Sequence, residues 1–144
     1  MIMSNTIHLK GERVFEQSRA AGATLTPGQL VMLNSSDAYV VHATSGGFAS
    51  RTVVEEDALQ GKTIAGTYAS GDLVAVSHNA PGGESYVFLK AGENVAKGDH
   101  LISGGDGTLI KTTGTPSQIM AIALEAKDLS ASSAVNTRIR VRWM

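Results

Sequence analysis

Three short segments of the chain share a turn that contains glycine, followed by a polar residue and the apolar start of a strand. They are residues 27–31 (PGQLV), 70–74 (SGDLV) and 97–101 (KGDHL). Glycine accepts the positive φ that tight turns demand, and the polar side chain after it can hydrogen-bond to the nearby backbone. The Leu and Val residues that follow favour a strand that is buried on at least one face. The pattern predicts a compact β-protein built from turns, with no chemically reactive side chain on those turns.

Length and composition fit one domain with an interacting surface. A chain of 144 residues can bury roughly 68–70% of its unfolded surface in a single core. Charged residues make up 17% of the chain, below the roughly 25% that is usual for soluble domains. A surface with so little charge is compatible with burial against partners. The net charge of −1 gives no reason to expect non-specific binding to nucleic acid.

Several classes of protein are disfavoured by what the sequence lacks. It contains no cysteine, which excludes disulfides, thiolate metal sites and cysteine nucleophiles. No apolar run reaches the roughly 18 residues of a membrane span, so no membrane partner is expected. The first residues, MIMSN, lack a basic region followed by an apolar core, so we expect no signal peptide and synthesis in a cytoplasm.

Strand signals are dense from Thr24 onward, and no segment is typical of a long amphipathic helix. A single helical turn is expected at residues 55–60, before Gly61. Residues 118–125 suit a helix or a buried strand by periodicity, and the surrounding β pattern favours a strand. The expected strands are residues 30–33, 39–43, 51–55, 63–68, 72–78, 85–90, 100–103, 108–111 and 137–143. These segments predict a mainly β fold, a compact antiparallel β-barrel or sandwich.

The first 22 residues differ from the rest of the chain. Four apolar residues are scattered there among charged ones: Ile7, Leu9, Val14 and Phe15. We interpret residues 1–22 as an extended N-terminal arm that pairs at a sheet edge or reaches a neighbour; a poorly ordered terminus is the alternative. Residues 23–144 then form a single β-rich domain.

The last strand carries the clearest alternation in the chain. Because strand side chains alternate between faces, residues 137–143 (TRIRVRW) place three arginines on one face and three apolar residues on the other. Arg138, Arg140 and Arg142 are therefore candidates for a basic stripe that meets an acidic partner; an ordinary solvated face is the alternative. Without aromatic residues interleaved on that face, they are weak evidence for nucleic-acid binding.

No catalytic, metal-binding or cofactor-binding residue is predicted. The four histidines (His8, His42, His78 and His100) are not spaced as a metal pair, and no serine lies in a Gly-x-Ser-x-Gly motif. Residues 55–57 are an acidic run, but adjacent residues on a strand point to opposite faces of the sheet. Their spacing therefore does not by itself bring two carboxylates together as a catalytic or cation-binding pair. The glycine-rich segment 104–107 lacks the Lys-Ser/Thr of a phosphate-binding loop, and it is typical of a hairpin turn.

The order and spacing of several motifs resemble the small head-decoration, or capsid-cement, proteins of tailed bacteriophages. The resemblance covers about residues 20–142. It rests on residues 25–31 (LTPGQLV), 91–101 (AGENVAKGDHL), 106–109 (DGTL) and 122–126 (IALEA), before a terminal strand of alternating arginines. These are turn-and-strand motifs, and their order along the chain carries more information than any one of them.

This resemblance implies a β-rich, β-tulip-like domain that assembles as a homotrimer on the outer surface of an expanded phage head. It implies binding to the major capsid protein at junctions between its subunits, often with an N-terminal arm on the shell, and no enzymatic activity. The contact candidates on this interpretation are Ile7, Leu9, Val14, Phe15, Arg138, Arg140 and Arg142.

A ligand-binding or carrier-type β-barrel module of a larger complex is the competing hypothesis, because carrier domains use similar turns. Such domains need a modified lysine on an exposed hairpin tip. Lys90, Lys97 and Lys111 lie instead at predicted strand ends or before a Gly-Asp turn. A hydrolase or isomerase on a β-barrel has less support, because no nucleophile–base or metal spacing appears.

Overall fold

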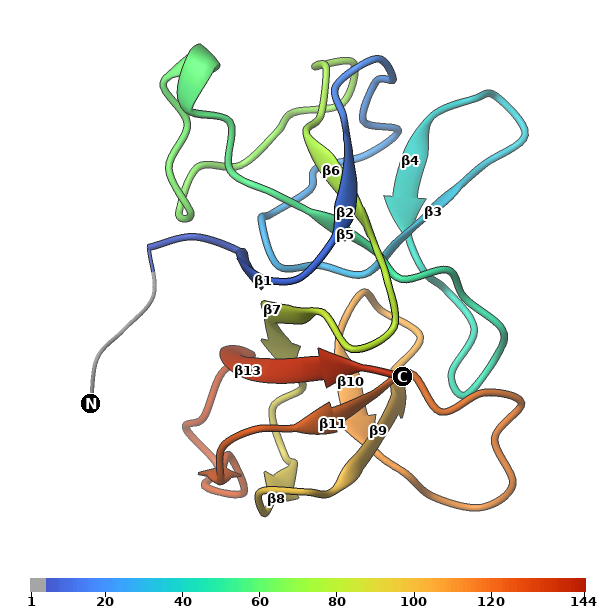
Figure 1. Ribbon diagram of the computed structural model, residues 1–144, viewed down its shortest axis with the longest axis vertical. Helices are drawn as coiled ribbons and strands as arrows, with labels where there is room; N and C mark the ends of the chain where they lie inside the picture. Colours follow the sequence, from blue (N-terminus) through green and yellow to red (C-terminus); the bar gives the residue numbers. More distant parts are fainter. Residues whose placement is uncertain (1–4) are drawn as a thin grey trace.

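The computed structural model describes residues 5–144, and these residues form short strands with one helical turn. Figure 1 shows two parts, with the strands of the N-terminal half above and those from β7 onward below. The elements in chain order are β1 (His8–Lys10), β2 (Arg13–Glu16), β3 (Val31–Leu33), β4 (Tyr39–Val41), β5 (Thr52–Val54), η1 (Ala58–Gln60), β6 (Val76–Asn79), β7 (Glu84–Leu89), β8 (Asn94–Val95), β9 (His100–Ser103), β10 (Leu109–Lys111), β11 (Ala121–Ala123), β12 (Lys127–Asp128) and β13 (Thr137–Trp143).

Five strands in the lower part close into a barrel. They pair in the order β7-β10-β9-β11-β13, and β13 returns to β7 through six antiparallel residue pairs. The β9–β10 hairpin surrounds the glycine-rich turn predicted at residues 104–107. The β7–β10 pairing is parallel, and the other pairings of the barrel are antiparallel. The predicted mainly β fold with an antiparallel barrel is therefore confirmed.

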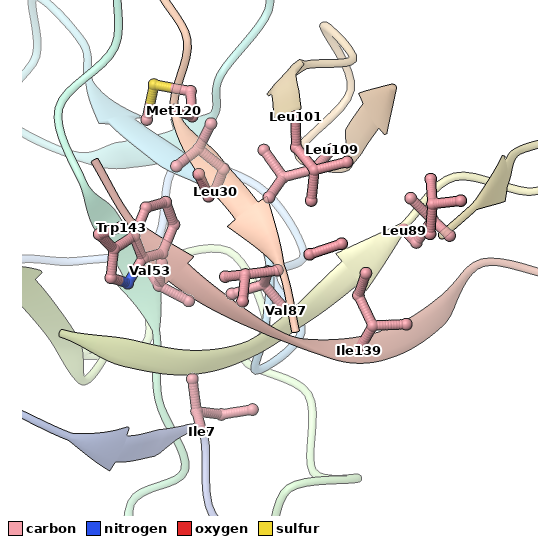
Figure 2. Close-up of a cluster of buried hydrophobic side chains, with 14 of the residues drawn as sticks. Ile7, Leu30, Val53, Val87, Leu89, Leu101, Leu109, Met120, Ile139 and Trp143 are labelled. Atoms are coloured by element: carbon pink, nitrogen blue, oxygen red, sulfur yellow. The ribbon is translucent and has the colours of Figure 1, made fainter. Parts of the chain in front are cut away.

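The barrel is filled by aliphatic side chains and one tryptophan (Figure 2). Ile139, Val141 and Trp143 of β13 point inward and are at most 1% exposed, as the alternation of that strand predicts. Fully burying one such aliphatic side chain contributes about 1.5–3 kcal/mol. Leu30 and Val53 come from the N-terminal half but belong to the same cluster. The upper and lower parts thus share one core.

The upper part adds two small sheets and a second core. Strands β2, β6 and β5 form a three-stranded antiparallel sheet, and β3 pairs with β4. Leu25 and Tyr68 lie fully buried in a cluster between these sheets and the adjoining turns. The Tyr68 hydroxyl donates a hydrogen bond to the backbone carbonyl of Glu55 at 2.7 Å, so this buried polar group is satisfied.

The three glycine turns singled out in the sequence have the predicted conformation. Their glycines have positive φ: Gly28 (+99°), Gly71 (+93°) and Gly98 (+95°). In each turn the polar side chain after glycine accepts a hydrogen bond from the backbone N–H three residues before it, at 2.9–3.0 Å: Gln29 from Thr26, Asp72 from Ala69, and Asp99 from Ala96. The local hydrogen bond predicted from residue type is therefore present in all three turns.

The other expected elements are found with one clear difference. The helical turn before Gly61 and the strand within residues 118–125 are present as η1 and β11. Residues 63–68 form no strand, and β6 begins only at Val76. Tyr68 instead makes an isolated bridge to Leu25, with backbone hydrogen bonds of 2.8 and 3.0 Å. A strand needs a continuous neighbour, and the segments beside residues 63–75 pair with them only at single positions.

Candidate interaction surfaces

The outer face of β13 carries two exposed arginines, each beside a carboxylate. The side chains of Arg140 and Arg142 are 54% and 51% exposed. Arg140 lies 3.6 Å from Glu125, and Arg142 lies 3.6 Å from Glu84. Ion pairs this exposed contribute little to stability, so both guanidinium groups remain available to a partner. The face is therefore a mixed-charge surface of two arginines and two carboxylates, where the sequence suggested a basic stripe.

Arg138 has a different environment from the other two arginines. Its guanidinium donates hydrogen bonds to the carbonyl oxygens of Pro27 (3.0 Å) and Ile64 (2.6 Å). The same group lies 4.5 Å from the ring centre of Phe88, a cation–π contact. Burial lowers the pKa of Arg138 below its usual value. Arg138 therefore ties β13 to two loops of the N-terminal half.

The predicted N-terminal arm supplies two strands within the described part of the chain. β1 pairs with β7 along an edge, and β2 pairs with β6. Ile7 is fully buried and belongs to the shared hydrophobic cluster, so its side chain lies off the surface (Figure 2). Leu9 is partly buried. Val14 and Phe15, at 67% and 41% exposure, keep their candidacy as contact residues.

A groove of about 570 Å³ lies beside β2. It is lined by the β1–β2 turn and by the ends of β2 and β6. Its lining residues are His8, Gly11, Glu12, Arg13, Val14, His78, Asn79 and Ala80. Burial, together with the nearby Arg13 guanidinium, lowers the pKa of His8 below 6.5, so this imidazole is neutral at neutral pH.

A polar network links four strands next to this groove. The Tyr39 hydroxyl hydrogen-bonds to Glu16, and His78 contacts Glu16 at 3.4 Å and the Thr52 hydroxyl at 3.0 Å. The Tyr39 hydrogen bond lowers the pKa of Glu16, while burial raises the pKa of Tyr39. At neutral pH the pair therefore stays a carboxylate and a neutral phenol, and the network holds β2, β4, β5 and β6 together.

Glu55 is a buried carboxylate with an exposed partner. Its side chain is 3% exposed, and one carboxylate oxygen lies 3.0 Å from Nε of Arg13, whose side chain is 30% exposed. Burial raises the pKa of Glu55 above 4.5 despite the opposing effects of Ser77 and Arg13. The folded state therefore disfavours the ionised form, and ionisation of Glu55 reduces stability.

We predict a pH-dependent difference between the wild type and Glu55→Gln. As the pH falls from 8 toward 4.5, folded Glu55 takes up a proton before the unfolded chain does, so the wild type gains stability that the Gln variant does not. The free energy of unfolding, measured by denaturant titration across this range, should shift in favour of the wild type as the pH falls. A difference that stays constant across the range would contradict the raised pKa.

Sequence reasoning missed three residues on these surfaces. Tyr86 and Phe88 lie directly across from Arg140 and Arg138 in the β7–β13 pairing, and Glu12 lines the groove. Alternation within residues 84–89 puts the two aromatic residues on one face. Only the register of β7 against β13 shows that this face is also the arginine face.

Within residues 5–144 the structure contains no group of three or more His, Cys, Asp or Glu side chains arranged to hold a metal ion. The same residues include no helix that is both long and apolar enough to span a membrane.

Comparison with known proteins identifies one family and one fold. The model of the XM1 gp53 minor capsid protein family matches residues 2–143. No curated protein matches the chain significantly. Among solved structures, the head fiber gp8.5 N base of bacteriophage phi29 is similar, with a TM-score of 0.60 and 18% sequence identity, over 92% of this chain and 95% of that chain. At this identity the likeness shows a shared fold.

Proposed function

Because the chain belongs to the XM1 gp53 minor capsid protein family, we propose that it is a structural protein on the outer surface of a tailed-phage head. In this proposal it is a homotrimer that binds where major capsid protein subunits meet, and it stabilises the shell without enzymatic activity. The family match over residues 2–143 is the observation that carries the proposal. The fold shared with a phi29 head fiber protein supports it.

The physical basis of such stabilisation is linkage. A protein that binds only the assembled shell shifts the equilibrium toward assembly by mass action. In a trimer, once one subunit has bound, the other two are held at high effective concentration near their own sites. Weak contacts of each subunit then suffice for tight binding.

The exposed residues described above supply candidate contacts. On the barrel, Lys10 of β1 and Arg142 of β13 both lie opposite Glu84 of β7 in the strand register. One row of side chains therefore crosses three strands. With Arg140 this row presents more positive than negative charge toward solvent. On β2, Val14 and Phe15 present apolar surface. We propose that an acidic area of the shell meets the first surface and that the second adds apolar contact.

Co-sedimentation with expanded empty heads tests this function. We expect the protein to pellet with expanded heads and to raise their melting temperature, and light scattering of the free protein should give the mass of three chains. The double variant Arg140→Ser/Arg142→Ser should bind more weakly, with the larger loss at low salt, because exposed charge contacts are screened as salt rises.

Lys97→Ser is the control, because it also removes an exposed positive charge but lies in the turn between β8 and β9, outside the proposed contact row. It should bind as the wild type does. A protein that never associates with heads would refute the proposed function. An equal loss at all salt concentrations would remove the arginine face from the contact.

A further inference from the structure

The outer edge of β2 is a strand edge with free backbone groups. In the sheet order β2-β6-β5, β2 has a neighbour on one side only. The N–H of Ala80 donates to the carbonyl of Glu12, while the N–H of Asn79 donates to Arg51 on the β5 side. Because hydrogen-bonding direction alternates along a strand, Arg13 and Phe15 direct their N–H and C=O groups away from β6. Within residues 5–144 these groups have no backbone partner.

Each face of this edge carries one exposed apolar side chain beside charged neighbours, and the Arg13 guanidinium lies 5.2 Å from the ring centre of Phe15. Val14 (67% exposed) and Phe15 (41% exposed) are neighbours in sequence, so they point to opposite faces. Proteins normally protect edge strands with charge, proline or a covering loop, because an open edge pairs readily with another strand. An edge with an exposed apolar side chain on each face has the features of a site for an added strand.

The groove beside β2 gives the incoming strand a charge preference. Glu12 and Val14 lie on the same face of the edge, and both line the groove. The Glu12 carboxylate has no ion pair within residues 5–144, whereas Arg13 is paired with the buried Glu55. His8 is neutral at neutral pH and therefore does not compete as a counter-ion. A lysine or arginine side chain complements Glu12 in this groove.

We propose that the outer edge of β2 binds an extended segment of a capsid protein subunit as an added β-strand, a proposal that rests on the proposed function. The segment hydrogen-bonds to the outward N–H and C=O groups of Arg13 and Phe15. It places a basic side chain in the groove next to Glu12 and an apolar side chain beside Phe15. Because Glu12 and Phe15 face opposite sides of the sheet, these two side chains stand an odd number of residues apart in the segment.

Two substitutions at one position separate the backbone contact from the side-chain contact. Phe15→Pro removes the outward N–H and fills the edge with the proline ring, while the bonds between β2 and β6 are kept because Phe15 does not contribute to them. Phe15→Ile keeps the N–H, the strand propensity and an apolar side chain. We expect the affinity for expanded empty heads to fall at least about tenfold for the Pro variant and to stay within about threefold for the Ile variant.

Charge reversal tests the groove independently. Glu12→Lys should weaken head binding more than Glu12→Gln does, because it places like charges together in the groove. Hydrogen exchange of the wild type, with and without heads, tests the edge without any substitution. The amides of Arg13 and Phe15 should become protected on binding. Those of Val14 and Glu16, already bonded to β6, should change little.

The outcomes distinguish this inference from the function on which it rests. Wild-type binding that Phe15→Pro leaves unchanged, or binding without protection of the Arg13 and Phe15 amides, overturns the added strand and leaves the capsid function standing. If the Pro variant does not fold, the exchange measurement on the wild type decides. Absence of wild-type binding refutes both proposals. Self-association that is lost in Phe15→Pro without heads would assign the edge to a second copy of the chain and overturn the capsid segment as its occupant.

Discussion

Trp143→Ala should lower the free energy of unfolding by about 3–5 kcal/mol, the range for removing a large buried aromatic side chain. Trp143 is 1% exposed and is one of the largest fully buried side chains. Its indole N–H donates to the hydroxyl of the buried Ser85 at 2.8 Å. The substitution therefore leaves a cavity in the barrel and removes a hydrogen bond from a buried polar group. Denaturant titration followed by circular dichroism measures the loss.

Two further variants separate these contributions. Trp143→Phe keeps most of the buried volume but loses the N–H, so we expect a smaller cost of about 1–3 kcal/mol. Arg142→Ala changes the preceding residue, whose side chain is 51% exposed, and should stay within about 0.5 kcal/mol of the wild type. A loss below about 1 kcal/mol for Trp143→Ala would mean that the barrel core is not packed around this side chain.

The second large effect is expected at Gly11, in the turn between β1 and β2. Gly11 has a φ of +94°, and a Cβ at this position would lie 2.7 Å from the Cα of Gly83. Alanine would therefore meet both the left-handed backbone penalty and a clash with main chain that cannot rotate away. We expect Gly11→Ala to cost about 3 kcal/mol in the free energy of unfolding.

Gly71→Ala is the matched control for this prediction. Its φ of +93° is nearly the same, but a Cβ there has no neighbour within 4 Å. This variant should show the backbone penalty alone, about 1–2 kcal/mol. Equal losses for the two variants, measured by thermal and denaturant unfolding, would show that the approach of Gly11 to Gly83 adds nothing.

The candidate surfaces could be predicted from the sequence in part. What the sequence could not supply was which strands and loops lie next to one another. The alternation in residues 137–143 correctly separated the inward residues from the three arginines. It could not show that Arg138 is held by the carbonyls of Pro27 and Ile64, because those contacts join residues 111 and 74 positions apart. For the same reason, Ile7 was an arm residue by its local sequence and a core residue by its packing.

The glycine turns show where sequence information ends. Residue type alone determined the turns at Gly28, Gly71 and Gly98, since positive φ and the hydrogen bond of the next side chain are local properties. Two more turns, centred on Gly82 and Gly92, share the positive φ and the backbone hydrogen bond of these turns but not the side-chain hydrogen bond. In all five turns the glycine N–H donates a hydrogen bond of 2.8 Å to a carbonyl that is distant in the sequence. The pairs are Gly28 with Val54, Gly71 with Ala21, Gly82 with Trp143, Gly92 with Leu129, and Gly98 with Ala123.

No local pattern specifies those five carbonyls. A turn fixes the direction of its own N–H through a few dihedral angles, but the acceptor is chosen by how strands from remote parts of the chain pack around the shared core. The sequence by itself therefore determined that this protein is a β-fold built on glycine turns. Only the tertiary structure decided which strands those turns join, and so which edge and which face are left open to a partner.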